Sequence, residues 1–251
     1  MSKKSAENWT WPLIMSFIRI PLLFLGLGIV MFIYRLSGTS VGFFATSMGW
    51  NVPITNIVNF ICIGLLLWRS KVEGFHLKEL IGFDRSRLFR DVLMGIAYST
   101  LLFIPYMLGG FVVGLPIYLL SGSSIEQIFA LNADFIPLPA LWILLLNLPI
   151  FLLLNSTVEE LQYRGYAQGK LLKYSGKMRI GLLIPALGFG IQHTAYASTL
   201  LSAPIFVGGF FLWGLGIGIF AYRQQRLAPL IIAHLLTNMM TVLPVILFSS
   251  M

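Results

Sequence analysis

The sequence predicts an all-α protein, a polytopic bundle of about seven transmembrane helices (six to eight) with a cytoplasmic N-terminus. Hydrophobic residues make up 57% of the chain and charged residues only 10%, and the mean hydropathy is +0.86. Soluble domains contain about 25% charged residues, so this composition indicates an integral membrane protein. Uncharged runs longer than the roughly 20 residues that a membrane-spanning helix needs occur at 36–68, 92–125, 135–158 and 194–222.

The expected elements follow from these apolar runs. A short helix at the membrane surface is expected at 9–20, because tryptophans, Pro12 and Arg19 are typical of that interface. Pro105 and Pro116 are expected to kink the third of the spans that follow. These spans are predicted at about 21–36, 53–68, 92–120, 139–172, 180–195, 204–222 and 227–248.

The basic residues predict the orientation. Of the 17 lysines and arginines, two lie at the N-terminus, six in a basic loop at 69–91, four at 170–179 and two at 223–226. Placing these segments in the cytoplasm satisfies the positive-inside rule. The net charge of +8 therefore anchors the chain at a lipid bilayer and does not indicate a nucleic-acid partner. Lys3 and Lys4 precede no small-residue cleavage site, so the N-terminus is expected to be retained.

The most informative stretch is Ser156–Gly165, which places Glu159, Glu160 and Arg164 at the end of the uncharged run 135–158. One ionisable side chain at the centre of a membrane helix costs roughly 2.5–3.5 kcal/mol on insertion scales, so these three need partners or a function. Glu160 and Arg164 are four residues apart and are expected to pair on one helix face. Glu159 is turned roughly 100° away and is expected to lack that neutralisation.

Two histidines and an amide lie in the later spans. His193 ends the segment Phe189–His193, and His234 and Asn238 share a helix face at i, i+4. Measured from the flanking basic residues at 1.5 Å per residue, Glu159, His193 and His234 lie roughly 16, 21 and 12 Å below the cytoplasmic surface. This similar depth predicts one site. Phe189, Asn155, Tyr163 and Gln192 are expected to be ordinary packing residues, and Arg19 to be interfacial.

These residue types suit two chemistries. In the first, Glu159 and His193 hold a water that Glu159 deprotonates, while His234 and Asn238 donate hydrogen bonds to the oxyanion. In the second, Glu159, His193 and His234 bind zinc with one position open for water. The usual His-Glu-x-x-His spacing is missing from the sequence, so the metal-free chemistry is favoured. Serine and cysteine nucleophiles are disfavoured because neither a Gly-x-Ser-x-Gly elbow nor a suitably placed Cys–His pair occurs.

Three motifs resemble one known family. Glu159-Glu160-x-x-x-Arg164, Phe189-x-x-x-His193 and His234-x-x-x-Asn238 occur in this order on successive predicted helices. The pattern resembles the CPBP intramembrane proteases (CAAX proteases and bacteriocin-processing enzymes, also called Abi), which include the type II CAAX prenyl endopeptidases. The resemblance covers about 138–251, the expected catalytic core, while 1–137 match only as generic membrane helices.

The resemblance implies endoproteolysis within the bilayer. It implies that Glu159 activates a water together with His193 and that His234 and Asn238 bind the oxyanion. It also implies that Glu160 and Arg164 form a structural pair. The implied substrate is a membrane-associated protein or peptide, either a prenylated CAAX-type protein or a peptide in bacteriocin or signal-peptide processing. The bacterial plasma membrane is the expected location. A second hypothesis is a non-catalytic immunity or transporter-like protein whose buried charges bind an ion or a partner. No oligomeric state is predicted.

Overall fold

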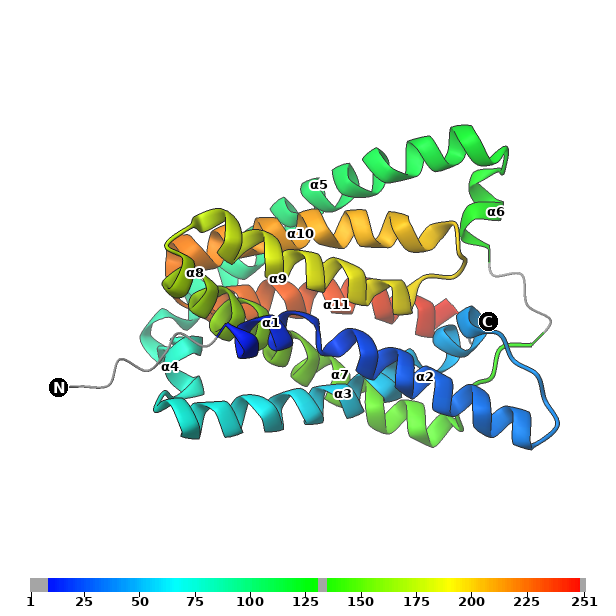
Figure 1. Cartoon of the computed structure of the whole chain (residues 1–251), viewed down its shortest axis with the longest axis horizontal. Coiled ribbons are helices and arrows are strands. Elements are labelled where there is room, and N and C mark those ends of the chain that lie inside the picture. The colour runs from blue at the N-terminus through cyan, green and yellow to red at the C-terminus, as the bar shows by residue number, and fades with distance from the viewer. Residues whose placement is uncertain (1–8, 131–134, 249–251) are drawn as a thin grey trace.

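The computed structural model describes residues 9–130 and 135–248, with side chains up to Met240. Every regular element in this part of the chain is helical, which confirms the predicted all-α class (Figure 1). Two short 3₁₀ helices, η1 and η3, and one π-helix, η2, interrupt the α-helices. The elements are α1 (Thr10–Phe17), α2 (Arg19–Leu36), α3 (Phe43–Glu73), α4 (Leu77–Ile81), η1 (Arg85–Arg87), α5 (Leu88–Ser121), α6 (Ile125–Phe129), α7 (Leu141–Glu159), η2 (Glu160–Gln168), α8 (Gly169–Ser175), α9 (Met178–Gln192), η3 (His193–Tyr196), α10 (Ser202–Gln224) and α11 (Ala228–Phe248).

Five helical segments of the described chain are long and apolar enough to cross a membrane. Apolar side chains remain exposed along them, for example Phe32, Phe103 and Leu145, as expected for helices that face lipid. Two other helical segments are shorter than these five. Helix α9 has 15 residues, and the apolar segment Ala228–Met240 at the start of α11 is also shorter. The count of seven spans therefore stays a prediction. The five segments are Arg19–Leu36, Phe43–Glu73, Leu77–Ser121, Leu141–Ser175 and Ser202–Gln224.

The basic segments meet at one end of the bundle, the end that carries α4 and α8 in Figure 1. Nη2 of Arg226 donates to the carbonyl oxygen of Gly82 at 2.9 Å, and Nζ of Lys170 lies 2.5 Å from Oε2 of Glu73. The expected basic loop at 69–91 is largely helical there, since it holds the end of α3, α4 and η1. This clustering is what a cytoplasmic face requires, although the orientation itself stays a prediction. Lys3 and Lys4 lie outside the described residues.

Helix α1 is part of the bundle and is not only a surface helix, which corrects the expectation for 9–20. Pro12, Met15 and Ser16 are buried, and α1 packs against α9 and η2. The approach to α9 is close: a Cβ on Gly188 would lie 1.7 Å from the carbonyl oxygen of Ser16. Only glycine allows such contact, so Gly188 lets α1 seat against α9 and α2 begin inside the protein.

The acidic motif lies where α7 changes into the π-helix η2. Glu159 is the last residue of α7 and Glu160 the first of η2, and the helix continues into α8. The sequence pattern predicts an ordinary α-helix in this region. Hydrogen bonds of the i→i+5 type widen the turn, and such segments occur frequently at functional sites.

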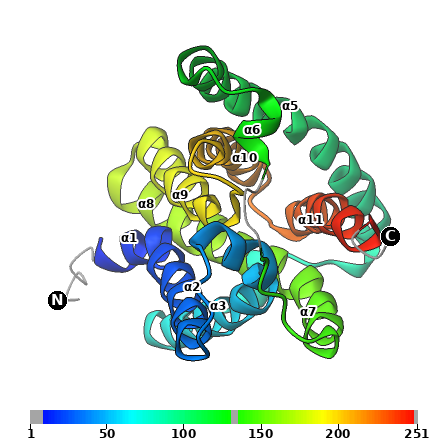
Figure 2. The same cartoon turned by 90° about the vertical axis from the view of Figure 1, so that its right-hand side faces the viewer.

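Viewed along the bundle, α11 lies beside α5, and α10 lies beside α9 (Figure 2). Two clusters of buried side chains fill the interior. Each cluster contains residues from both sides of the expected boundary between residues 137 and 138. Met15 and Leu66 pack with Tyr163 and Phe189 in one cluster, and Leu27 packs with Val158 in the other. The described parts of the two expected domains therefore share their cores.

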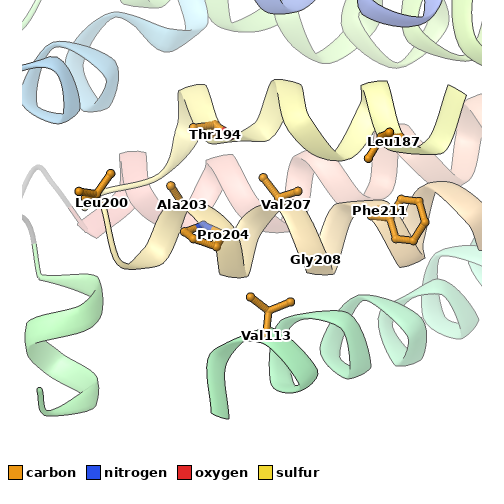
Figure 3. Close-up of a pocket in the computed structure, with 9 residues that line it drawn as sticks. All are labelled: Val113, Leu187, Thr194, Leu200, Ala203, Pro204, Val207, Gly208 and Phe211. Carbon is orange, nitrogen blue, oxygen red and sulfur yellow. The ribbon is translucent and has the colours of Figure 1, made fainter. Parts of the chain in front are cut away.

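An apolar groove of about 550 Å³ lies between α5, α9 and α10 (Figure 3). None of its lining residues is ionisable, so the chemistry expected from the sequence does not lie here. The lining residues are Val113, Leu187, Thr194, Leu200, Ala203, Pro204, Val207, Gly208 and Phe211.

Candidate active site

Glu160 and Arg164 form a buried ion pair, as their spacing predicts. Nη1 of Arg164 lies 3.1 Å from Oε1 of Glu160, and Nη2 donates to the carbonyl oxygen of Gly214 on α10 at 3.3 Å. The guanidinium also lies 4.5 Å from the centre of the Phe189 ring, a cation–π geometry. These contacts hold η2 against α9 and α10.

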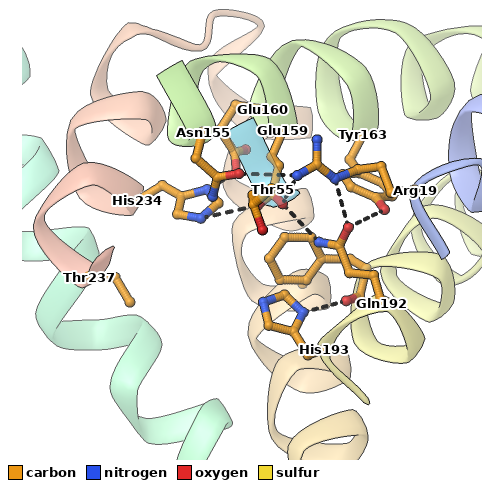
Figure 4. Close-up of polar contacts among 12 residues, drawn as sticks. Arg19, Thr55, Asn155, Glu159, Glu160, Tyr163, Gln192, His193, His234 and Thr237 are labelled. Carbon is orange, nitrogen blue, oxygen red and sulfur yellow. Dashed lines mark hydrogen bonds and ion pairs between the residues drawn. The ribbon is translucent and has the colours of Figure 1, made fainter. Parts of the chain in front are cut away.

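His234 of α11 connects the two carboxylates (Figure 4). Its Nδ1 lies 2.8 Å from Oε1 of Glu160, and its Nε2 lies 3.4 Å from Oε2 of Glu159. A carboxylate only accepts hydrogen bonds when ionised, so Nδ1 carries a proton in this arrangement. The rings of Trp213 and Phe189 pack edge-on against the imidazole, with centroids 4.9 and 5.9 Å away.

Glu159 has a cationic partner, which corrects the expectation that it lacks one. Nη2 of Arg19 lies 2.8 Å from Oε1 of Glu159, and the Arg19 side chain is fully buried. The expectation of an interfacial Arg19 is therefore wrong as well. The physical reason is the seating of α1 against α9, which brings the start of α2 into the interior.

The amide side chain of Gln192 belongs to the same network. Its Nε2 donates to Oε1 of Glu159 at 3.0 Å, and its Oε1 accepts from Nε of Arg19 at 2.8 Å and from the Tyr163 hydroxyl at 3.0 Å. Asn59 and Asn155 accept the remaining hydrogen bonds of Arg19. Three residues expected to be ordinary packing, Asn155, Tyr163 and Gln192, thus bind the site through polar atoms.

His193 is the first residue of η3 and lies beside this network. Its Nδ1 is 2.7 Å from the carbonyl oxygen of Phe189, and its ring stacks on Phe210 at 3.5 Å. Among the described hydrogen bonds, Gln192 contacts Glu159 directly and His193 does not. Phe189 links the histidines, since its ring lies 4.7 Å from that of His193 and 5.9 Å from that of His234.

Asn238 lies one turn after His234 on α11 and is partly buried. The other predicted site residues are more enclosed: Glu159 is 1% exposed, Glu160 0%, His234 3% and His193 9%. The structure therefore brings both carboxylates, both imidazoles and Arg164 into one nearly sealed region. Two carboxylates face two guanidiniums there, so the buried charges are paired, as burial requires.

The alternative zinc ligands do not converge in this arrangement. The described residues contain no group of three or more His, Cys, Asp or Glu side chains that could hold a metal ion. Oε1 of Glu159 is engaged by an ion pair with Arg19 and by a hydrogen bond from Gln192. Glu159, His193 and His234 thus do not fit a metal centre as placed, and metal dependence stays a matter for experiment.

Comparison with known proteins finds one family match. Residues 140–240 match the family described as type II CAAX prenyl endopeptidase Rce1-like. The match covers less than half of the chain and shows what this part is similar to. It supports the resemblance to CAAX proteases that the motifs indicate. No curated protein and no solved structure matches the chain.

The Rce1-like segment contains all seven predicted site residues, which are Glu159, Glu160, Arg164, Phe189, His193, His234 and Asn238. Arg19 contacts Glu159 from outside that segment, and Asn59 in turn contacts Arg19. The sequence held one signal for Arg19: it is the only charged residue between Glu7 and Arg35. Asn59 carried no comparable signal, since polar amides occur elsewhere in the apolar runs.

Proposed function

We propose that this protein is an intramembrane endopeptidase that cleaves a membrane-associated peptide of the CAAX type. The observation that carries the proposal is the buried cluster of Glu159, Glu160 and His234 inside the segment that matches a protease family. Charged groups are costly in a membrane bundle, and a cluster of them is a functional site by default.

Glu159 is the proposed general base. The carbonyl of Phe189 can only accept a hydrogen bond, so Nδ1 of His193 donates to it and Nε2 is left as an acceptor. A water held between Nε2 of His193 and Oε2 of Glu159 would lose a proton to Glu159 as its oxygen bonds the scissile carbonyl carbon. The proton then passes from Glu159 to the leaving amine nitrogen as the C–N bond breaks.

His234 and Asn238 are the proposed oxyanion donors. Because Nδ1 of His234 already donates to Glu160, the ring can donate to the oxyanion only through Nε2. The imidazole would then carry both protons, with Glu160 at Nδ1 and Glu159 beside Nε2. Glu160, held by Arg164, thereby fixes the orientation of His234.

The substrate must open the site before it reacts. Glu159 and Glu160 are almost fully buried, whereas His193 and Asn238 are the more exposed members of the predicted set. Water and peptide would therefore enter past these two side chains. Exclusion of bulk water after entry would strengthen every electrostatic interaction within the site.

A second candidate function is favoured by one observation, the Arg19–Glu159 ion pair. A carboxylate neutralised by a buried arginine can serve structure alone, as in a non-catalytic immunity or transporter-like protein. That function would survive Glu159→Gln wherever the fold survives. The bacterial plasma membrane is the proposed location in either case.

Cleavage of defined peptides tests the proposal. The purified protein in lipid vesicles would be given a farnesylated CAAX peptide, a geranylgeranylated one and the unprenylated peptide, with products identified by mass spectrometry. We expect the wild-type protein to release the C-terminal tripeptide, and we expect Glu159→Gln not to release it. Glu126→Gln, which changes an exposed carboxylate on α6, is the matched control. Equal cleavage by wild type and Glu159→Gln would refute general-base catalysis by Glu159.

A further inference from the structure

Arg19 reaches the candidate site from outside the Rce1-like segment. It is the first residue of α2 and is fully buried. Its three nitrogens contact side chains of three other helices: Nε donates to Gln192 on α9 at 2.8 Å, and Nη1 donates to Asn59 on α3 at 2.8 Å. Nη2 donates to Asn155 at 3.1 Å and lies 2.8 Å from Oε1 of Glu159, both on α7. The planar guanidinium is thus fixed in orientation as well as in position.

The same contacts fix the amide of Gln192. Its Oε1 accepts hydrogen bonds from Arg19 and from the Tyr163 hydroxyl, so that atom must be the oxygen. Its Nε2 is consequently directed at Oε1 of Glu159, 3.0 Å away. Arg19 therefore contacts Glu159 twice, once directly and once through Gln192.

Both contacts converge on one oxygen of Glu159. With an ion pair and a hydrogen bond on Oε1, the carboxylate can rotate little, and Oε2 is the oxygen left for chemistry. Oε2 lies 3.4 Å from Nε2 of His234, one of the two predicted oxyanion donors (Figure 4). A base held by such an outer set of hydrogen bonds is pre-organised for proton transfer.

We infer that Arg19 is a positioning residue that orients Glu159, so that the N-terminal helices complete the proteolytic site. This inference rests on the proposed endopeptidase function. It differs from a purely structural role, in which Arg19 would join helices without affecting the chemical step. The difference shows in kcat, because a rotated base slows the reaction, whereas the fully buried Arg19 offers no surface to the substrate.

The test compares variants of the two buried arginines of α2 and α3. Arg19→Met is expected to lower kcat on the order of 10²-fold, the effect of misplacing a reacting group by about 1 Å, with KM within about twofold. Arg19→Lys keeps a cation but not the planar fork of the guanidinium. Its kcat is expected to lie between those of the wild type and Arg19→Met. Arg69→Met is the control: Arg69 is nearly buried and pairs with Glu73 at 2.5 Å, away from the site.

The cleavage assay with the farnesylated peptide gives kcat and KM, and thermal unfolding with size-exclusion chromatography gives the folded fraction. The expected result is a loss of thermal stability in both Met variants and a loss of kcat in Arg19→Met alone. A folded Arg19→Met with wild-type kcat would overturn the inference while leaving the protease proposal intact. If Arg19→Met fails to fold, wild-type kcat in Arg19→Lys would overturn it equally. A wild-type protein that cleaves none of the peptides would remove the proposed function and this inference together.

Discussion

The imidazole of His234 donates through Nδ1 to Oε1 of Glu160 at 2.8 Å, joining the start of α11 to the start of the π-helix η2. Since Arg164 binds the same oxygen of Glu160 at 3.1 Å, one carboxylate serves as the anchor for both side chains. Glu160 therefore positions His234, and Nε2 of His234 faces Glu159. The two adjacent glutamates thus have separate roles.

The first prediction concerns the stability of this anchor. Glu160→Gln leaves the Arg164 cation buried without its partner, and breaking a buried pair costs about 3–5 kcal/mol. The double variant Glu160→Gln/Arg164→Met removes both charges and should recover part of the loss. Thermal unfolding in detergent measures both effects. An unchanged melting temperature in Glu160→Gln would show that the pair does not stabilise the fold.

The second prediction separates the histidines. His193→Gln is expected to lower kcat about 10²-fold, the effect of misplacing a reacting group, because Nε2 of His193 holds the attacking water. His76, just before α4, is exposed, so His76→Gln is the matched control and should retain wild-type activity. Steady-state cleavage of the farnesylated peptide compares the two. Wild-type kcat in His193→Gln would remove His193 from the mechanism.

The third prediction concerns Asn238. If its amide donates to the oxyanion, Asn238→Ala should lower kcat about 10²–10³-fold and change KM little. Asn147, which bonds Asn56 and its own helix, provides a matched control because it lies outside the site. Asn147→Ala should therefore change stability and not kcat. A large rise in KM with unchanged kcat in Asn238→Ala would assign Asn238 to substrate binding instead.

The fourth prediction links packing to the site. Gly188→Ala places a methyl group against the carbonyl of Ser16, which must push α1 away from α9 and move Arg19. Overpacking of this kind costs about 1–3 kcal/mol, and activity should fall with stability. Gly64→Ala in α3 is the control, since a Cβ there meets no atom within 4 Å. Equal melting temperatures for the two variants would show that α1 tolerates displacement.

The fifth prediction concerns metal. We expect elemental analysis of the protein, purified without chelators, to find zinc well below one atom per chain. The prediction rests on the spacing of the motifs and on the ion pair and hydrogen bond that engage Oε1 of Glu159. Stoichiometric zinc in the wild type that is lost in His193→Gln would contradict it and favour the metalloprotease chemistry.

Sequence patterns predicted the local features of this protein well. The apolar runs placed the helices, and the i, i+4 spacing placed Glu160 beside Arg164 because both effects act within a few residues of chain. The pairing of Arg19 with Glu159 joins helices far apart in sequence, and helical spacing carries no information about such contacts. An arginine among tryptophans is equally typical of a membrane interface, so its burial was not predicted.

The site was also predicted only in part. Similar depths suggested that the motifs meet, and the structure does gather both carboxylates and both imidazoles. The π-helical turn after Glu159 was missed because no residue preference marks it. The direct partner of Glu159 from α9 is Gln192, the neighbour of His193, and helical spacing does not predict that contact.

The central claim is that Glu159 is the base of an intramembrane endopeptidase, and one measurement tests it most directly. Wild type and Glu159→Gln, both shown to be folded, are given the farnesylated CAAX peptide in lipid vesicles, and the released tripeptide is quantified by mass spectrometry. The account predicts tripeptide from the wild type and at least about a hundredfold less from Glu159→Gln. Equal release from both proteins, or none from the wild type, would contradict it.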